Sequence, residues 1–231
     1  MAVGNRVYLK RELPDWELVS RFDGIPAANI GDCMNRSCAM SCRIKLMSSP
    51  DKCMTGVALT VKARQGDNLL IHKALKMAGE GDVIVVSNEE GNERALIGEL
   101  MAATAEYKKV AGLVFDGPIR DLDSIGQMKL PVYATGSTPG GPYKSGPGEI
   151  NVPIACGGIS VEPGDIIVGD KDGIIVIPKN DASQIIGRAI EKNASDSAGL
   201  VKSRSGEAKR EWVEPALETA GCELIDGIYT R

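Results

Sequence analysis

The sequence predicts an α/β protein in which helices lie outside a central, largely buried sheet. One observation is the strand, helix, strand order between residues 56 and 87. A second is the helical pattern of residues 94–109, which leads directly into the apolar run 112–116. No internal repeat or low-complexity linker divides the 231 residues, so we predict one compact unit.

The elements of the first half follow from periodicity and helix-start signals. Residues 26–33 are a predicted helix with proline in its first turn, and a loop rich in cysteine and methionine follows. Residues 56–63 alternate as a strand, and residues 66–78 repeat apolar side chains at helical spacing after the capping-type Asp67. The apolar run 82–87 is a second buried strand.

Residues 94–109 form the next predicted helix, with small and apolar residues three and four apart. Gly98 lies within this pattern, where glycine is conformationally costly. Either the helix begins at Gly98 or a ligand approaches closely there. The strand 112–116 follows.

The second half is rich in short strands. We predict a short helix at 124–128 and a strand at 130–136. Residues 136–148 are so rich in glycine and proline that they form a loop. Residues 151–178 contain three or four short strands joined by PGD and KDG turns, which indicates an antiparallel or mixed sheet. A helix from Asp181 to Lys192 ends the predicted core.

The tail, residues 193–231, is charged and weakly periodic, with one further short helix near residues 211–220. Packing of this tail on a neighbouring chain is one interpretation.

Composition and charge exclude several classes of protein. Hydrophobic residues make up 43% and charged residues 25%, which are globular proportions. The net charge of −4 disfavours a nucleic-acid partner, because phosphate binding needs a basic surface. No apolar stretch approaches the roughly 20 residues that cross a bilayer, and no signal-peptide region is present. We therefore expect a cytoplasmic protein with small-molecule or protein partners and no membrane contact.

Cysteine and histidine are poor candidates for the chemistry. The first four of six cysteines have no CxxC spacing, so a zinc site is disfavoured and free buried thiols are expected. His72 is the only histidine, which excludes a multi-histidine metal site. Its place in LLIHKAL favours a packed or half-exposed helix residue over a catalytic base. An enzyme with this sequence would depend on carboxylates, arginine, lysine, water or a metal.

Three charged residues form a candidate constellation. Glu99 precedes Arg120 by 20 intervening residues, and Asp121 follows at once. If the helix and the strand 112–116 lie side by side, the start of the helix and the end of the strand meet at one edge of the sheet. The first-turn amides of Leu100 and Met101 would then point free N–H donors into the same space, which favours an anion.

This group of residues suits a particular ligand. Two carboxylates with water suit Mg²⁺ or Mn²⁺, whereas a guanidinium and helix-end amides suit a carboxylate. The combination fits a metal-chelated 2-oxo acid, whose enolate a Lewis acid stabilises. On the residues alone, a solvated turn with an ion pair is the commoner alternative, because surface salt bridges are frequent and weak.

Three motifs in order resemble the RraA-like family, which includes the class II 4-hydroxy-4-methyl-2-oxoglutarate/4-carboxy-4-hydroxy-2-oxoadipate aldolases. They are GDNLLIHKALKMAGEGDVIVVS, the GELMA and RDLD pair at this spacing, and KSGPGEINVPIACGGISVEPGDIIVGDKDGIIVIP. The resemblance implies a single domain over residues 1–231, with a core of about 20–192 and a C-terminal extension of 193–231. It implies an α/β/β/α sandwich resembling the swivelling phosphohistidine domain, assembled as homotrimers or homohexamers with active sites between subunits.

The aldolases of this family carry an acidic residue, twenty others, and then Arg-Asp, which Glu99, Arg120 and Asp121 match. The resemblance implies that Asp121 binds the divalent metal, that Glu99 holds metal-bound water and that Arg120 binds the pyruvyl part. Gly98 and the amides of Leu100 and Met101 complete the implied substrate site. Some versions of the motif have a further acidic residue where this chain has Ser124, with Asp123 one place before it.

The family also places an acidic residue of the neighbouring subunit near the metal-bound water. Asp196 and Glu191 are the two candidates, with a solvated helix face as the alternative for either. A Schiff-base route is disfavoured because no lysine belongs to the constellation, although Lys144 and Lys171 stay open as neighbours in space.

The resemblance implies cleavage of a 4-hydroxy-2-oxo acid to pyruvate, with oxaloacetate decarboxylation through the same enolate. The alternative is a non-catalytic regulator that binds ribonuclease E, as the name-giving family member does. Such regulators typically lack the full acidic, Arg and Asp set, so the set present here favours an enzyme.

Overall fold

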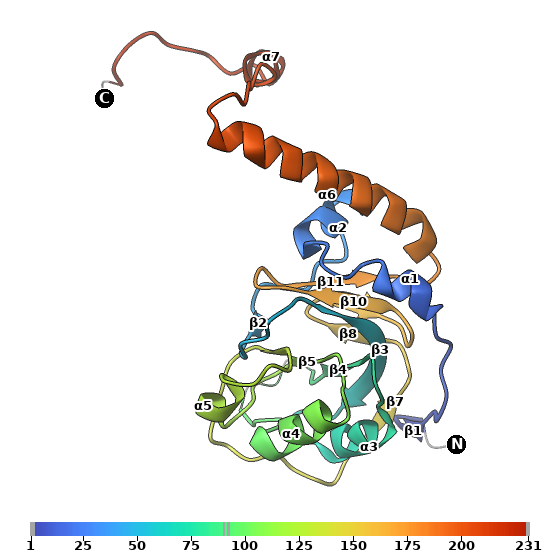
Figure 1. The fold of residues 1–231 in the computed structure, drawn as a ribbon. Coiled ribbons are helices and arrows are strands. Elements are labelled where there is room, and N and C mark those ends of the chain that lie inside the picture. The colour runs from blue at the N-terminus through green and yellow to red at the C-terminus, as the bar shows by residue number, and fades with distance from the viewer. Residues whose placement is uncertain (1–2, 90, 92, 230–231) are drawn as a thin grey trace. The chain divides into compact units, whose positions relative to one another are not determined.

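The computed structural model describes residues 3–89, 91 and 93–229. The chain forms two compact units, Met1–Asn193 and Ala194–Arg231. The first unit holds every strand of the described residues (Figure 1).

The helices and strands of the first unit alternate along the chain. They are β1 (Asn5–Val7), α1 (Trp16–Ser20), α2 (Ala27–Cys33), β2 (Lys45–Leu46), β3 (Met54–Ala63), α3 (Leu69–Met77), β4 (Asp82–Ser87), α4 (Glu99–Tyr107), β5 (Gly112–Asp116), α5 (Leu122–Ile125), β6 (Val132–Ala134), β7 (Gly148–Ile150), β8 (Ile154–Cys156), β9 (Ile159–Val161), β10 (Ile166–Gly169), β11 (Ile174–Ile177) and the start of α6 (Ala182–Arg204). The second unit holds the end of α6 and α7 (Val213–Thr219).

The described strands form a nine-stranded mixed sheet and the separate β8–β9 hairpin. The order along the main path is β1-β7-β3-β4-β5-β6-β2, with β3, β4, β5 and β6 parallel. The long strand β3 also pairs antiparallel with β10 at its start, and β10 pairs with β11. Strand β3 therefore belongs to both sheet layers of the molecule.

Alternation of side chains along the strands builds three separate cores. Ile84 and Val86 of β4 point toward the core beneath α3 and α4, whereas Val83 and Val85 point the other way. In β10 and β11 the same alternation divides the central core from a third core against α1, α2 and the start of α6. Three cores separate four layers.

The predicted α/β/β/α sandwich is therefore confirmed. Figure 1 shows α3, α4 and α5 on one side of the strands and α1 and α2 on the other. The strands 82–87 and 112–116 have the predicted bounds, and the region 151–178 holds four strands.

Some element bounds differ from prediction for identifiable reasons. Helix α4 begins at Glu99 with Gly98 as its N-cap. The interpretation that the helix starts at Gly98 therefore describes the backbone. Helix α5 begins at Leu122, before the predicted residue 124. The prediction that the helix after Asp181 ends at Lys192 was wrong. Helix α6 continues to Arg204, because no proline interrupts it before Gly206, whose φ of +77° suits the residue after a helix end.

The sequence did not predict the short elements β1, α1 and β2. Two of them are strands of two or three residues whose pairing partners, β7 and β6, lie far along the chain. Such short edge strands show little hydrophobic periodicity in the sequence, because pairing with a distant strand, rather than burial of alternate side chains, determines where they form. In the described part of the chain, no helix combines the length and apolarity that crossing a bilayer requires.

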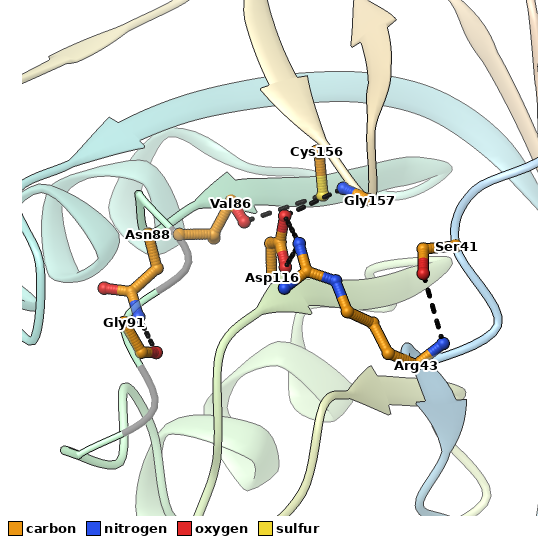
Figure 2. A network of polar contacts seen from close by, with 8 residues as sticks. All are labelled: Ser41, Arg43, Val86, Asn88, Gly91, Asp116, Cys156 and Gly157. Carbon is orange, nitrogen blue, oxygen red and sulfur yellow. Dashed lines mark hydrogen bonds and ion pairs between the residues drawn. The ribbon is translucent and has the colours of Figure 1, made fainter.

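A buried polar network joins the end of β5 to other layers (Figure 2). The carboxylate of Asp116 is 5% exposed and lies 2.7 Å from the Nη2 atom of Arg43. It also accepts a hydrogen bond of 2.8 Å from the Gly157 amide in the β8–β9 turn. This network fixes the edge of the sheet from which the chain continues to Arg120.

Candidate active site

Two segments that follow neighbouring strands run side by side and build the site. The Leu96 amide donates to the Pro118 carbonyl at 2.9 Å, and the Arg120 amide donates to the Ile97 carbonyl at 3.0 Å. Parallel strands β4 and β5 end at the same edge of the sheet, so both segments start from that edge. This pairing brings the start of α4 next to Arg120 and Asp121, as the sequence predicted from topology.

Gly98 lies in direct contact with both charged residues. A Cβ atom at Gly98 would lie 2.2 Å from Asp121 Oδ2 and 2.9 Å from Arg120 Nε. The φ of −139° and ψ of −170° are ordinary extended values. The absence of a side chain, rather than a special backbone conformation, is therefore what this position requires.

Asp121 is held in the left-handed conformation, with a φ of 58° and a ψ of 44°. Aspartate and asparagine tolerate this region better than most residues. Its Oδ2 atom accepts a hydrogen bond of 2.9 Å from the Glu99 amide and lies 3.7 Å from Arg120 Nε. The side chains of Arg120 and Asp121 are 45% and 41% exposed, so both can reach a ligand.

The first turn of α4 differs in part from the expectation of two free amides. The Met101 amide donates to the Gly98 carbonyl at 3.1 Å, which completes a tight first turn. Among the described residues the Leu100 amide has no acceptor. One predicted donor is therefore available to an anion at this helix end, together with the positive end of the helix dipole.

A pocket of about 380 Å³ joins these residues. Gly98, Glu99, Leu100, Met101, Arg120 and Asp121 all line it. Its volume falls within the usual range for small-molecule sites, roughly 300–1,000 Å³. All the predicted site residues are thus brought together in one chain.

Among the further residues that line this pocket, three carry polar side chains that the sequence did not assign to it: Asn68, His72 and Lys144. Asn68 is 3% exposed, and its Nδ2 donates to the Leu96 carbonyl at 3.0 Å. Its Oδ1 atom is buried without a partner among the described residues, so it is a vacant acceptor. The spacing of Asn68 and His72, four residues apart at the start of α3, was the one signal that they share a helix face.

The charge of Lys144 acts on His72, which lines the same pocket. Burial, and secondly the charge of Lys144, lower the pKa of His72. The imidazole is therefore largely neutral at pH 7 and adds no positive charge to the site. Lys171, the other lysine left open, lines a different pocket with Cys53 and Asp170.

The donor set decides which metal fits. Among the described residues, no three His, Cys, Asp or Glu side chains gather as a closed metal cage. Asp121 and Glu99 are two carboxylates on an open pocket. Mg²⁺ keeps several waters and commonly binds through one or two carboxylates plus its substrate, so these residues fit such an ion.

Glu191, one candidate acidic residue, lies on the exposed side of α6. The start of this helix packs against β10 and β11, on the opposite side of the sandwich from α4. Asp196, the other candidate, belongs to the second compact unit. Within one chain, Glu191 therefore belongs to a different layer from the pocket.

The fold and this pocket together define an α/β sandwich with a small-molecule-sized pocket at the start of a helix, and comparison with known proteins gives the family. The family model described as "RraA-like: Aldolase/RraA" matches residues 27–176. The chain belongs to the RraA-like family.

Relatives with an aldolase name are more than a third identical to this chain over the aligned residues. A protein of Halalkalibacterium halodurans named "Putative 4-hydroxy-4-methyl-2-oxoglutarate aldolase" is 37% identical over 182 residues, which are 79% of this chain and 86% of that protein. A protein of the same name from Ectopseudomonas mendocina is 40% identical over 124 residues, 54% of this chain and 76% of that protein.

Solved structures of the family have the same fold. RraAS2 of Streptomyces coelicolor, described as an unusual member of the RNase ES inhibitor RraA protein family, gives a TM-score of 0.74 at 26% identity, over 83% of this chain and 99% of that one. The RNA-processing inhibitor RraA from Thermus thermophilis gives a TM-score of 0.62 at 28% identity, over 66% of this chain and 92% of that one.

Proposed function

We propose that this protein is a divalent-metal-dependent class II aldolase that cleaves a 4-hydroxy-2-oxo acid to pyruvate. The observation that carries the proposal is the convergence of Glu99, Arg120 and Asp121 on one pocket at the start of α4. The aldolase names of the relatives agree with this chemistry. A substrate of the 4-hydroxy-4-methyl-2-oxoglutarate or 4-carboxy-4-hydroxy-2-oxoadipate type fits the proposal.

Asp121 directly, and Glu99 through water, would hold Mg²⁺ or Mn²⁺. When bound, such an ion supplies Lewis-acid stabilisation to the ketone and carboxylate oxygens of the substrate. The remaining steps depend on residues of the chain.

Arg120 and the free Leu100 amide bind the 2-oxo carboxylate end of the substrate. A carboxylate of the pocket, or a water that it holds, accepts the proton of the C4 hydroxyl group. The C3–C4 bond then breaks, and its electron pair moves toward the C2 ketone oxygen, where the guanidinium of Arg120 stabilises the negative charge. Protonation at C3 gives pyruvate, and C4 leaves as the carbonyl carbon of the second product.

The same enolate forms when carbon dioxide leaves oxaloacetate, so oxaloacetate decarboxylase activity belongs to the proposal. We further propose a cytoplasmic homotrimer or homohexamer in which Asp196 or Glu191 of a neighbouring copy completes the site.

Pyruvate release tests the function. Purified protein with 4-hydroxy-4-methyl-2-oxoglutarate and Mg²⁺ should release pyruvate, and EDTA should abolish the release. We expect Arg120→Ala and Asp121→Asn each to lower kcat/KM by about 100-fold or more, since the first removes the positive charge that stabilises the developing anion and the second removes the carboxylate that would hold the ion. Asn suits position 121 because it keeps the left-handed conformation.

Lys129→Ala is the matched control, because it removes an exposed charge that pairs with the exposed Asp51. This variant should keep wild-type turnover. Absence of metal-dependent pyruvate from the wild type would exclude the aldolase proposal.

The structural likeness to RNA-processing inhibitors favours one second candidate, a regulator that binds ribonuclease E. A protein that releases no pyruvate but slows RNA cleavage by ribonuclease E at stoichiometric concentration would support this candidate instead.

A further inference from the structure

A groove of about 630 Å³ lies between α3 and α4, next to the candidate pocket. Its apolar walls come from Leu69 and Leu75 of α3 and from Leu100 and Met101 of α4. Leu100 is 83% exposed, so this apolar surface is open to solvent. A contiguous apolar surface of this kind typically marks an interaction site. Because His72, Leu100 and Met101 also line the candidate pocket, a segment bound in the groove would lie beside that pocket.

The charged side chains of the groove are basic. Lys73, Lys76 and Lys108 line it, and no carboxylate of the described residues does. Lys108 Nζ donates to the Leu75 carbonyl at 2.8 Å and to the Lys76 carbonyl at 3.0 Å, so this lysine is bound to the end of α3. Lys73 and Lys76 are exposed and lie three residues apart, on the same side of α3. The groove therefore fits a partner segment that combines apolar and acidic side chains.

Residues 211–226 of the tail have this complementary character. They carry five carboxylate side chains and no lysine or arginine. In α7, Val213 and Leu217 lie one turn apart on one side of the helix, and Glu214 and Glu218 lie on the adjoining side. None of the described residues of α7 is buried, and Trp212 at its N-cap is 67% exposed. An amphipathic helix of this type binds with its apolar side in a groove.

The point from which the tail starts favours the groove of another copy of the chain. Helix α6 begins in the core that it shares with α1 and α2, whereas α3 and α4 cover a different core on the other side of the sandwich. A tail in the groove of its own chain would have to pass around the sheet layers. A neighbouring copy presents the same groove without this detour.

We propose that residues 211–226 of one copy bind the groove between α3 and α4 of a neighbouring copy. The apolar side of α7 meets the leucines of the groove, and Glu214 and Glu218 meet Lys73 and Lys76. The proposal goes beyond the proposed function, because this contact requires neither a metal nor turnover. The contact contributes to assembly and not to folding, since the tail belongs to none of the three cores.

Reversal of charge on either side of the contact tests the proposal in the full-length protein. The groove variant is Lys73→Glu with Lys76→Glu, and the tail variant is Glu214→Lys with Glu218→Lys. All four side chains are exposed, so both variants should fold as the wild type does, which circular dichroism checks. In sedimentation velocity over a concentration series, each variant alone should associate about tenfold more weakly or less, because like charges then face each other.

An equimolar mixture of the two variants tests whether the contact joins separate copies. In the mixture the reversed tail meets the reversed groove, and the unchanged tail meets the unchanged groove. Association should therefore return to within about threefold of the wild type, although neither variant associates well alone. Binding of the tail within its own chain cannot give this result, because mixing leaves each chain unchanged.

Lys10→Glu with Lys45→Glu is the matched control, because it reverses two exposed lysines that do not line the groove. This control should associate as the wild type does. A monomeric wild type, wild-type association in the groove or tail variant, equal weakening in the control, or no recovery on mixing would each overturn the proposal. Failure of the proposed function would appear differently, as absent pyruvate release with association and its recovery intact.

Discussion

Gly98 shows how one missing methyl group shapes the candidate site. The nearest atoms to a Cβ at this position are Oδ2 of Asp121 and Nε and Cγ of Arg120. Both side chains are partly exposed and can move aside, so a methyl group would displace them without breaking the core. The residue therefore matters to the geometry of the charged groups more than to folding.

We predict that Gly98→Ala lowers kcat/KM for pyruvate release by about tenfold or more, because misplacement near 1 Å is costly in a positioned site. Its melting temperature should change by less than about 3 °C, since no buried backbone atom opposes the new methyl group. The control is Gly79→Ala, where a Cβ would meet nothing within 4 Å. Equal activity of the two variants would show that Arg120 and Asp121 need not stay where Gly98 allows them.

At the scale of elements, the Asp116 network connects β5 to the loop before β2 and to the β8–β9 turn (Figure 2). A buried carboxylate must keep its partners, because an unpaired buried charge is costly. Arg43 supplies the compensating charge with a side chain that is 33% exposed. The network thus stabilises the sheet edge from which the segment leading to Arg120 begins.

We predict that Arg43→Met lowers the free energy of unfolding by about 1–3 kcal/mol, below the usual cost of breaking a fully buried pair because water reaches the guanidinium. Urea denaturation measures this change. Lys129→Met, which breaks the exposed pair with Asp51, should cost less than about 1 kcal/mol. If the two variants unfold at the same urea concentration, Asp116 does not depend on Arg43.

At the scale of the whole molecule, the two compact units differ in how they are stabilised. All three hydrophobic cores lie within the first unit, and their last members are Ile185, Ile186 and Ala189 of α6. The described residues of α7 include none that are buried. Stability of the first unit should therefore not depend on residues 194–231.

We predict that a chain ending at Asn193 unfolds cooperatively within about 3 °C of the full-length protein when followed by circular dichroism. A chain ending at Lys179 is the control, because it also removes the buried Ile185 and Ile186. This shorter chain should unfold at a markedly lower temperature, since burying each such side chain contributes about 1.5–3 kcal/mol. A large fall in the unfolding temperature of the chain that ends at Asn193 would mean that the tail stabilises the core.

The sequence was sufficient for the layered α/β fold, because alternation and helical spacing are local properties of β4, β5, α3 and α4. It was also sufficient to predict that Glu99, Arg120 and Asp121 lie close together, since parallel neighbouring strands end at one sheet edge. It could not show that the Met101 amide is already bonded, because the tightness of a first turn depends on its packing.

The sequence by itself determined which element types form and that an acidic, arginine and aspartate set meets at the start of a helix. Only the tertiary structure decided that Asn68, His72 and Lys144 share that pocket and that Asp67 holds the loop beside it. The reason is physical. Periodicity reports the burial of a residue within its own helix or strand, whereas the wall of a pocket is made by hydrogen bonds between segments about 80 residues apart, which carry no local pattern.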